Sequence, residues 1–266
     1  MKKLITYLLA LLAGTQFLLA QTPELIREIH GDFIDFTTDN IGNTYLLTRQ
    51  NQLKKYNPDG DSLSVFNDVK RFGKLYSMDA SNPLKLVLYY RDFSTVVELD
   101  RLLNVRNTID LKKLNIFQPK AVGLSNDNNI WVYDELEAQL KKVGQDGMLR
   151  SATTDLRQAL DSLPSPTVLS DQDALVYLYD TTKGVYLFDY FGTLKNRLPF
   201  RGWQDFQVLG KFMFGRKNTI LYRYETGSLQ LQEQDLAAIL QDVLKLRVNM
   251  QRLYVLHPGK LQVYRL

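Results

Sequence analysis

Apolar and polar residues alternate along this chain in a pattern that returns at regular intervals. Each copy begins with a turn rich in Asp, Asn or Gly, continues with a short apolar run, and then alternates apolar and polar positions. The clearest copies span 37–60, 125–147 and 170–192, and weaker ones span 84–100, 211–224 and 251–264. A period of two over short segments bounded by turn residues predicts β-strands.

The third strand of each copy gives the register of the repeat. Its closing apolar residues follow one another at intervals of 43, 44, 45, 36 and 40 positions: Tyr56, Leu99, Val143, Phe188, Tyr224 and Tyr264. A period near ~40 residues with short strands is typical of β-propellers, in which each repeat forms one four-stranded sheet. The prediction is an all-β, six-bladed β-propeller with four-stranded blades, formed as a single domain by residues 21–266. The fifth repeat is the least regular.

The two ends of the repeat array complement each other. The sixth repeat ends at Leu266, directly after its third strand, and an additional alternating segment, 24–29, precedes the first repeat. Pairing of Leu25–Ile29 with Leu261–Tyr264 would complete the last blade and remove an exposed sheet edge. We therefore expect the N-terminal strand to close the ring.

Two segments depart from the strand pattern. Leucines stand at helical spacing in 154–163, where Asp155 is a candidate N-cap, and this segment is predicted as a helical insertion between the third and fourth blades. Apolar residues also stand at helical spacing in 234–244. That segment is either a second short helix or an outer strand followed by a connector.

Residues 1–20 have the order of a secretory signal peptide. Lys2 and Lys3 precede an apolar run, and Ala20 is a small residue at the expected cleavage position. The alternative is a retained membrane anchor, but the apolar run is shorter than the roughly 20 residues of a spanning helix. No later stretch approaches that length. We expect export to the periplasm, to the outer-membrane periphery or out of the cell.

Composition excludes disulfides and a lipid-modified cysteine, and it does not favour a nucleic-acid partner. The chain has no cysteine, and therefore neither disulfides nor a lipid-modified cysteine. Its net charge of +4, from 33 basic and 29 acidic residues, includes Lys2 and Lys3 of the predicted signal peptide. The remainder is nearly balanced, which gives no indication of a nucleic-acid partner.

One stretch resembles a known repeat. Residues 172–192 contain an acidic turn, an aromatic-rich strand that ends at Asp180, and the strand Val185–Phe188 followed by Asp189. This order resembles the repeat of the NHL-type and TolB-like six-bladed propellers of the bacterial envelope. The resemblance is strong in three repeats, and it implies the fold of the whole mature chain. A fold of this kind hosts many functions, so it does not specify one.

Residues suited to catalysis are scarce. The two histidines, His30 and His257, have no cysteine to complete a zinc site, and neither a Gly-x-Ser-x-Gly turn nor a phosphate-binding glycine loop is present. Lactonase-like propellers hold a central calcium ion at the inner strand ends, and four residues lie near such positions: Asp32, Asp79, Asn126 and Asp205. The preferred explanation is that they bond turn backbone groups. We expect no metal, no cofactor and no enzymatic activity, with a metal-dependent lactonase or lyase as the alternative.

The connectors between blades carry aromatic and basic residues side by side. These connectors share one face of a propeller with the loops between second and third strands. The predicted partner-binding face consists of Arg71, Phe72, Tyr90, Arg91, Phe117, Lys120, Arg201 and Trp203. Aromatic residues and arginine anchor protein interfaces. The predicted function is a protein–protein interaction scaffold or accessory subunit of the cell envelope, with a glycan or small-ligand binder as a further alternative. Trp131, inside a second strand, is predicted to lie in the core.

Overall fold

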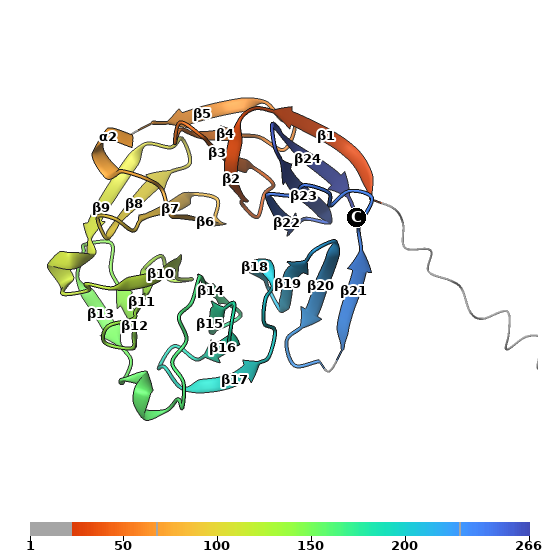
Figure 1. The fold of residues 1–266 in the computed structure, drawn as a ribbon. Coiled ribbons are helices and arrows are strands. Elements are labelled where there is room, and N and C mark those ends of the chain that lie inside the picture. The colour runs from red at the N-terminus through yellow and green to blue at the C-terminus, as the bar shows by residue number, and fades with distance from the viewer. Residues whose placement is uncertain (1–22, 68, 229) are drawn as a thin grey trace, which may run out of the picture.

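The computed structural model describes residues 23–67, 69–228 and 230–266, and the predicted signal peptide lies outside them. Six four-stranded antiparallel sheets form a ring of blades around a central channel (Figure 1). The predicted six-bladed propeller is therefore confirmed. No helix within the described ranges is long and apolar enough to cross a membrane.

Each blade runs outward from an inner strand that lines the channel. The first blade consists of β2 (Phe33–Thr38), β3 (Thr44–Thr48), β4 (Leu53–Tyr56) and β5 (Ser62–Phe66). The second consists of β6 (Ser77–Asn82), β7 (Lys85–Tyr90), β8 (Thr95–Asp100) and β9 (Val105–Asp110). The third consists of β10 (Pro119–Leu124), β11 (Ile130–Asp134), β12 (Gln139–Val143) and β13 (Leu149–Ala152).

The remaining three blades follow the same order. The fourth consists of β14 (Val168–Gln172), β15 (Leu175–Asp180), β16 (Gly184–Phe188) and β17 (Leu194–Leu198). The fifth consists of β18 (Gln204–Leu209), β19 (Phe212–Lys217), β20 (Ile220–Glu225) and β21 (Leu231–Asp235). The sixth consists of β22 (Lys245–Asn249), β23 (Arg252–His257), β24 (Lys260–Arg265) and the N-terminal strand β1 (Glu24–His30).

The predicted ring closure is confirmed in its register. Strand β1 pairs antiparallel with β24, so that Leu25 lies opposite Tyr264 and Ile29 lies opposite Leu261. In Figure 1, β1 follows the outer edge of the sixth blade. The Glu28 carboxylate accepts hydrogen bonds from Lys260 Nζ at 3.0 Å and from Gln262 Nε2 at 2.7 Å.

Apolar side chains fill the spaces between neighbouring blades. Trp131 is 1% exposed and lies in one cluster with Leu169 and Leu178 of the next blade, as predicted for a core residue. A buried carboxylate strengthens this junction. Asp171 Oδ2 accepts hydrogen bonds from Ser125 Oγ and Trp131 Nε1 at 2.9 Å each, and Oδ1 accepts one from Tyr190 at 2.6 Å. Buried polar groups normally need such partners.

The acidic turns of the repeat have a local structural cause. Asp39, Asp100 and Asp189 each accept, with one carboxylate oxygen, the N–H groups two and four residues ahead at 2.9–3.1 Å. Asn57 does the same with its amide oxygen at 2.8–3.0 Å. The side chain thereby satisfies turn N–H groups that no strand can pair. The repeated Asp or Asn is thus a turn-forming residue.

Helical structure is limited to short turns. The predicted insertion at 154–163 contains a single 3-10 turn, η2 (Leu156–Gln158), whose N-cap Asp155 accepts the Arg157 N–H. In 234–244 the strand-plus-connector alternative is correct, because the segment begins with the end of β21 and contains no helix. Two other turns, α2 (Val69–Phe72) and η1 (Leu111–Leu114), have no counterpart in the sequence prediction.

Removing β1 should destabilise the whole ring, because β24 would regain an unpaired edge. We expect a chain that begins at Gly31 to unfold about 10 °C below one that begins at Pro23, as a loss of about 3–5 kcal/mol implies for a domain of this size. Circular dichroism would follow the transition. A synthetic peptide of residues 23–30 should restore the midpoint, whereas a scrambled peptide should not. Equal midpoints for the two chains would contradict a stabilising closure.

Candidate functional site

The two faces of the ring differ in charge. The loops that join first to second and third to fourth strands form one face, here called the hairpin face. Its acidic residues outnumber its basic ones, Arg101 and Lys211, and include Asp59, Asp61, Asp127, Asp146, Asp173 and Asp189. The opposite face, here called the connector face, holds the connectors between blades and the loops between second and third strands. Basic residues dominate it between the first and third blades.

A group of basic and aromatic side chains occupies this part of the connector face. We call it the basic–aromatic sector, and it consists of Arg71, Lys74, Tyr76, Arg91, Phe93, Lys112, Lys113, Phe117 and Lys120. Phe93 and Phe117 are 54% and 55% exposed, which is unusual for large apolar side chains. Gly73 permits the close approach of Phe93, since a Cβ at that glycine would lie 2.9 Å from the ring.

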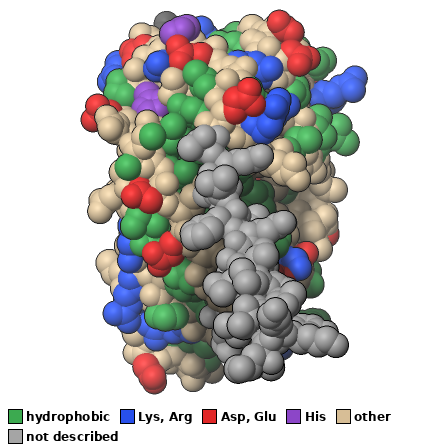
Figure 2. All heavy atoms as spheres, turned by 90° about the vertical axis from the view of Figure 1, so that its right-hand side faces the viewer, with side chains coloured by type: hydrophobic (Ala, Val, Ile, Leu, Met, Phe, Trp, Pro, Cys, Tyr) green, Lys and Arg blue, Asp and Glu red, His purple; other side chains and the backbone are tan. Residues whose placement is uncertain are grey.

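The rim formed by β1, β24 and β21 has a different character. Figure 2 shows acidic and basic side chains interspersed among hydrophobic ones on that side of the ring. The basic–aromatic sector lies away from this rim, on the connectors of the first three blades.

Arg91 is held in a fixed position at the centre of the sector. Its guanidinium lies 3.3 Å from the centre of the Tyr76 ring and donates a hydrogen bond to the Lys120 carbonyl at 3.2 Å. Tyr89, beneath Tyr76, donates from its hydroxyl to the Pro119 carbonyl at 2.6 Å and so links the second blade to the third. Burial raises the pKa of Tyr89 to about 12, although the Arg91 charge opposes that shift. The hydroxyl therefore remains a neutral donor.

The acidic residues near the sector only partly compensate its charge. Glu135 lies 3.5 Å from Lys120 Nζ, and Asp92 is exposed in the same loop as Arg91. Lys74, Lys112 and Lys113 form no ion pair with a residue that the structure describes. The sector therefore presents an excess of positive charge beside exposed aromatic rings.

The eight residues predicted as a binding face divide into two groups. Phe72, Tyr90 and Trp203 are 4%, 3% and 2% exposed and pack between blades, with the Phe72 and Tyr90 rings 5.3 Å apart. Trp203 stacks on Phe200 at 4.5 Å. This burial corrects the expectation that the three aromatic residues lie on a binding face, because each fills a junction between sheets.

The remaining predicted residues are at least partly exposed. Arg71, Arg91, Phe117 and Lys120 lie in the basic–aromatic sector. Arg201 is exposed on the connector between the fourth and fifth blades, which is opposite the junction of the first and second blades in a ring of six. The structure therefore brings four of the eight together and separates the fifth from them.

Five members of the sector are absent from the predicted binding face: Lys74, Tyr76, Phe93, Lys112 and Lys113. The adjacent lysines stand in the same connector as Phe117, and that proximity is a signal in the sequence. Tyr76 gives no such signal, because its contact with Arg91 joins residues of different loops.

Three of the four candidates for a central calcium site have side chains engaged elsewhere. Asp32 pairs with Arg49 at 2.9 Å and Asp205 with Arg216 at 2.8 Å. Asp79 accepts the N–H groups of Leu124 and Ser81, which supports the preferred backbone-bonding explanation. The backbone N–H of Asn126, in the third blade, donates to the Asp171 carboxylate of the fourth blade. Among residues 23–67, 69–228 and 230–266, no three His, Asp or Glu side chains are grouped to hold a metal ion.

The two histidines lie in the sixth blade, as the closure predicts. Both His30 and His257 are register partners of Lys260, on its two neighbouring strands. His30 pairs with Glu28 at 3.0 Å, and burial lowers the pKa of His257. A lysine between two imidazoles disfavours a shared cation, so the pair provides no obvious metal site.

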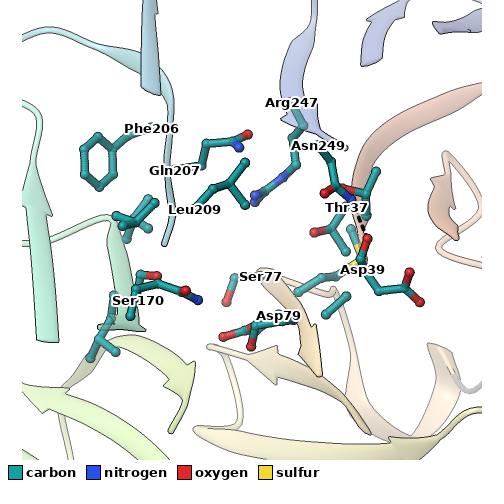
Figure 3. A pocket seen from close by; sticks show the side chains of 18 of the residues that line it. Thr37, Asp39, Ser77, Asp79, Ser170, Phe206, Gln207, Leu209, Arg247 and Asn249 are labelled. Atoms are coloured by element: carbon teal, nitrogen blue, oxygen red, sulfur yellow. Dashed lines mark hydrogen bonds between the residues drawn. The ribbon is translucent and has the colours of Figure 1, made fainter. Parts of the chain in front are cut away.

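The inner strands of all six blades enclose a central cavity of about 530 Å³ (Figure 3). Its polar lining side chains include Thr37, Asp79, Ser170, Gln207, Arg247 and Asn249. Gln207 is fully engaged with the sixth blade, donating to the Val248 carbonyl at 2.7 Å and accepting the Val248 N–H at 3.0 Å.

Solved structures confirm the class of fold. No protein-family model and no curated protein matches the chain. Virginiamycin B lyase from Staphylococcus aureus is 11% identical, with a TM-score of 0.61 over 90% of this chain and 98% of the lyase. The Neurospora crassa Pan2 WD40 domain is 9% identical, with a TM-score of 0.62 over 91% and 97%. A structure of YCF48 bound to D1 peptide is 10% identical, with a TM-score of 0.56 over 92% and 100%.

Likeness at this level of identity shows the fold alone. The chain is a six-bladed β-propeller, in agreement with the resemblance of its repeat to the NHL-type and TolB-like propellers. The function has to be argued from its own residues.

Replacing Arg91 by alanine should remove both the stacking on Tyr76 and the hydrogen bond to the Lys120 carbonyl. We expect the free energy of unfolding to fall by about 1–2 kcal/mol, measured by urea denaturation. The matched control, Arg201→Ala on a distant connector, should change it by no more than about 0.5 kcal/mol. A loss in Arg91→Ala no greater than that of the control would mean that Arg91 is not held in place.

Proposed function

We propose that this propeller is a non-catalytic binding protein that holds a protein partner through the basic–aromatic sector. The observation that carries the proposal is the concentration of arginine, lysine and exposed aromatic rings on the connectors of the first three blades. Exposed apolar patches with a polar surround mark interaction sites more often than ordinary surface does. Arginine and aromatic residues provide most of the binding energy in protein interfaces.

The charge of the sector indicates the chemistry of its partner. Lys74, Lys112 and Lys113 add positive charge around Arg91, and a partner segment rich in Asp or Glu would complement them. Phe93 and Phe117 offer apolar contact beside these charges. The partner is therefore an acidic polypeptide segment that also carries aromatic or aliphatic side chains.

Two further observations support a binding role over a catalytic one. Three of the four candidate calcium residues, Asp32, Asp79 and Asp205, are already engaged in ion pairs or backbone hydrogen bonds. The YCF48 structure, which has the same type of fold, is described as bound to a peptide. Of the eight residues of the predicted face, the proposed binding surface keeps Arg71, Arg91, Phe117 and Lys120.

Binding can be tested with peptides displayed as a random library. We expect the enriched peptides to combine acidic and aromatic residues. Fluorescence anisotropy should show affinity falling about 10- to 100-fold in an Arg91→Glu, Lys112→Glu, Lys120→Glu variant, because like charges then face each other. Higher salt should weaken binding to the wild-type protein.

A matched control separates the sector from general charge effects. Arg201→Glu makes the same type of change on a distant connector and should bind within about twofold of wild type. Circular dichroism would verify that every variant is folded. Equal binding by wild type and the triple variant, or no enrichment of acidic peptides, would refute this function.

We also propose that the chain is exported and acts in the cell envelope. The support is the order of residues 1–20, with Lys2 and Lys3 before an apolar run and Ala20 at its end. Expression of the full chain in a Gram-negative host should yield periplasmic protein that begins at Gln21, as N-terminal sequencing would show. Cytoplasmic protein that retains Met1 would contradict export.

A further inference from the structure

The central channel contains an arginine without a partner. Arg247 lies in the middle of β22, and Figure 3 shows its guanidinium pointing from the wall into the open cavity. A second cavity of about 300 Å³, between the fourth, fifth and sixth blades, is also lined by Arg247. Arg247 therefore lines both cavities.

The neighbours of Arg247 on the same side of β22 are bonded to the first blade. Lys245 pairs with Asp35, and Asn249 donates to the Thr38 hydroxyl and to the Asp39 carbonyl. The Arg247 guanidinium, between them, forms no hydrogen bond or ion pair with any residue that the structure describes, and its Nε is buried. Arg247 thus differs from both of its neighbours.

The acidic groups around Arg247 are committed to other partners. Asp35 pairs with Lys245, Asp205 pairs with Arg216, and Asp79 accepts two backbone N–H groups. Burial lowers the pKa of Arg247, and the more distant charges of these three carboxylates raise it. They attract the cation without satisfying its N–H groups.

An unsatisfied guanidinium in a cavity has a preferred complement. A buried donor without an acceptor is unfavourable, and the planar fork of arginine matches the two oxygens of a carboxylate. Ser77, Asp79 and Ser170 lie on the channel wall opposite Arg247 in Figure 3. They could bond hydroxyl groups at the other end of the same ligand. The volume is within the range of small-molecule sites.

We propose that the channel binds a small carboxylate that carries further hydroxyl groups, with Arg247 bound to the carboxylate. A monoanion fits better than a dianion such as phosphate, because one negative charge neutralises Arg247 whereas a second would face Asp79, whose carboxylate has no cationic partner among the described residues. This site is separate from the basic–aromatic sector. Either can fail without the other.

Thermal unfolding of the whole protein with gluconate, glucuronate, glucose and inorganic phosphate tests the site. Glucuronate and glucose form a matched pair that differs in the carboxylate. We expect the two sugar acids to raise the unfolding midpoint in a saturable manner, by about 3–5 °C at ten times Kd, and glucose to have little effect. Stabilisation by phosphate that exceeds that by the acids would refute the carboxylate assignment.

Variants of Arg247 connect any binding to the guanidinium. Arg247→Gln should weaken sugar-acid binding about 10- to 100-fold, and Arg247→Lys should weaken it less, because it keeps the charge but loses the fork. Arg201→Gln, which removes an exposed arginine elsewhere, should bind as wild type does.

Stability without ligand gives an independent readout. The unfolding midpoint of ligand-free Arg247→Gln should equal or exceed that of wild type, because the substitution removes a partly buried guanidinium whose Nε has no acceptor. A clear drop in that midpoint would assign Arg247 a structural role and overturn the proposal. Failure of both sugar acids to stabilise the wild-type protein beyond glucose would overturn it as well.

Discussion

The pairing of β1 with β24 is the constraint on which the rest of the ring depends. Every blade is a separate sheet, and its apolar faces are covered only by the blades on either side. Without closure, the first and sixth blades would each lose a neighbour. The same pairing brings β22 beside β2, where Lys245 reaches Asp35 and Asn249 reaches the Asp39 carbonyl. The position of Arg247 between these two contacts is thus a consequence of closure.

The junctions between blades use similar packing but different polar groups. Tyr89 and Tyr179 each donate from a second strand to a carbonyl of the next blade, at 2.6 Å and 2.7 Å. Asp171 joins the third and fourth blades through its carboxylate, and Gln207 joins the fifth and sixth through its amide. Because each is buried, an unsatisfied partner would be costly. Because the polar residue differs from one junction to the next, the repeats share their strand pattern but not their polar residues.

The sequence predicts the features of this fold that depend on periodicity. Strand spacing gives the six blades, and the additional segment before the first repeat gives the closure. The sequence cannot show that Phe72 is buried and Phe117 exposed, because both are aromatic residues of a connector with a basic residue nearby. The α2 turn directs Phe72 between two sheets, whereas Phe117 follows η1 and stays exposed. The sequence also gives no sign that Arg247 is unpartnered. Lys245–Asn249 has the pattern of an ordinary alternating strand, and the residues that pair with Lys245 and Asn249 belong to another blade.

The charges on the two faces of the ring have different causes. On the hairpin face, Asp127, Asp146 and Asp189 each bond backbone N–H groups of their own turns, so folding itself accounts for them. On the connector face, Lys112 and Lys113 make no ion pair with a described residue. The fold therefore does not require their charge. Like charges that gather on a surface repel one another, so such a group is mildly unfavourable for the isolated protein. The acidic residues therefore follow from the propeller architecture, whereas the basic ones are what the proposed acidic partner would neutralise.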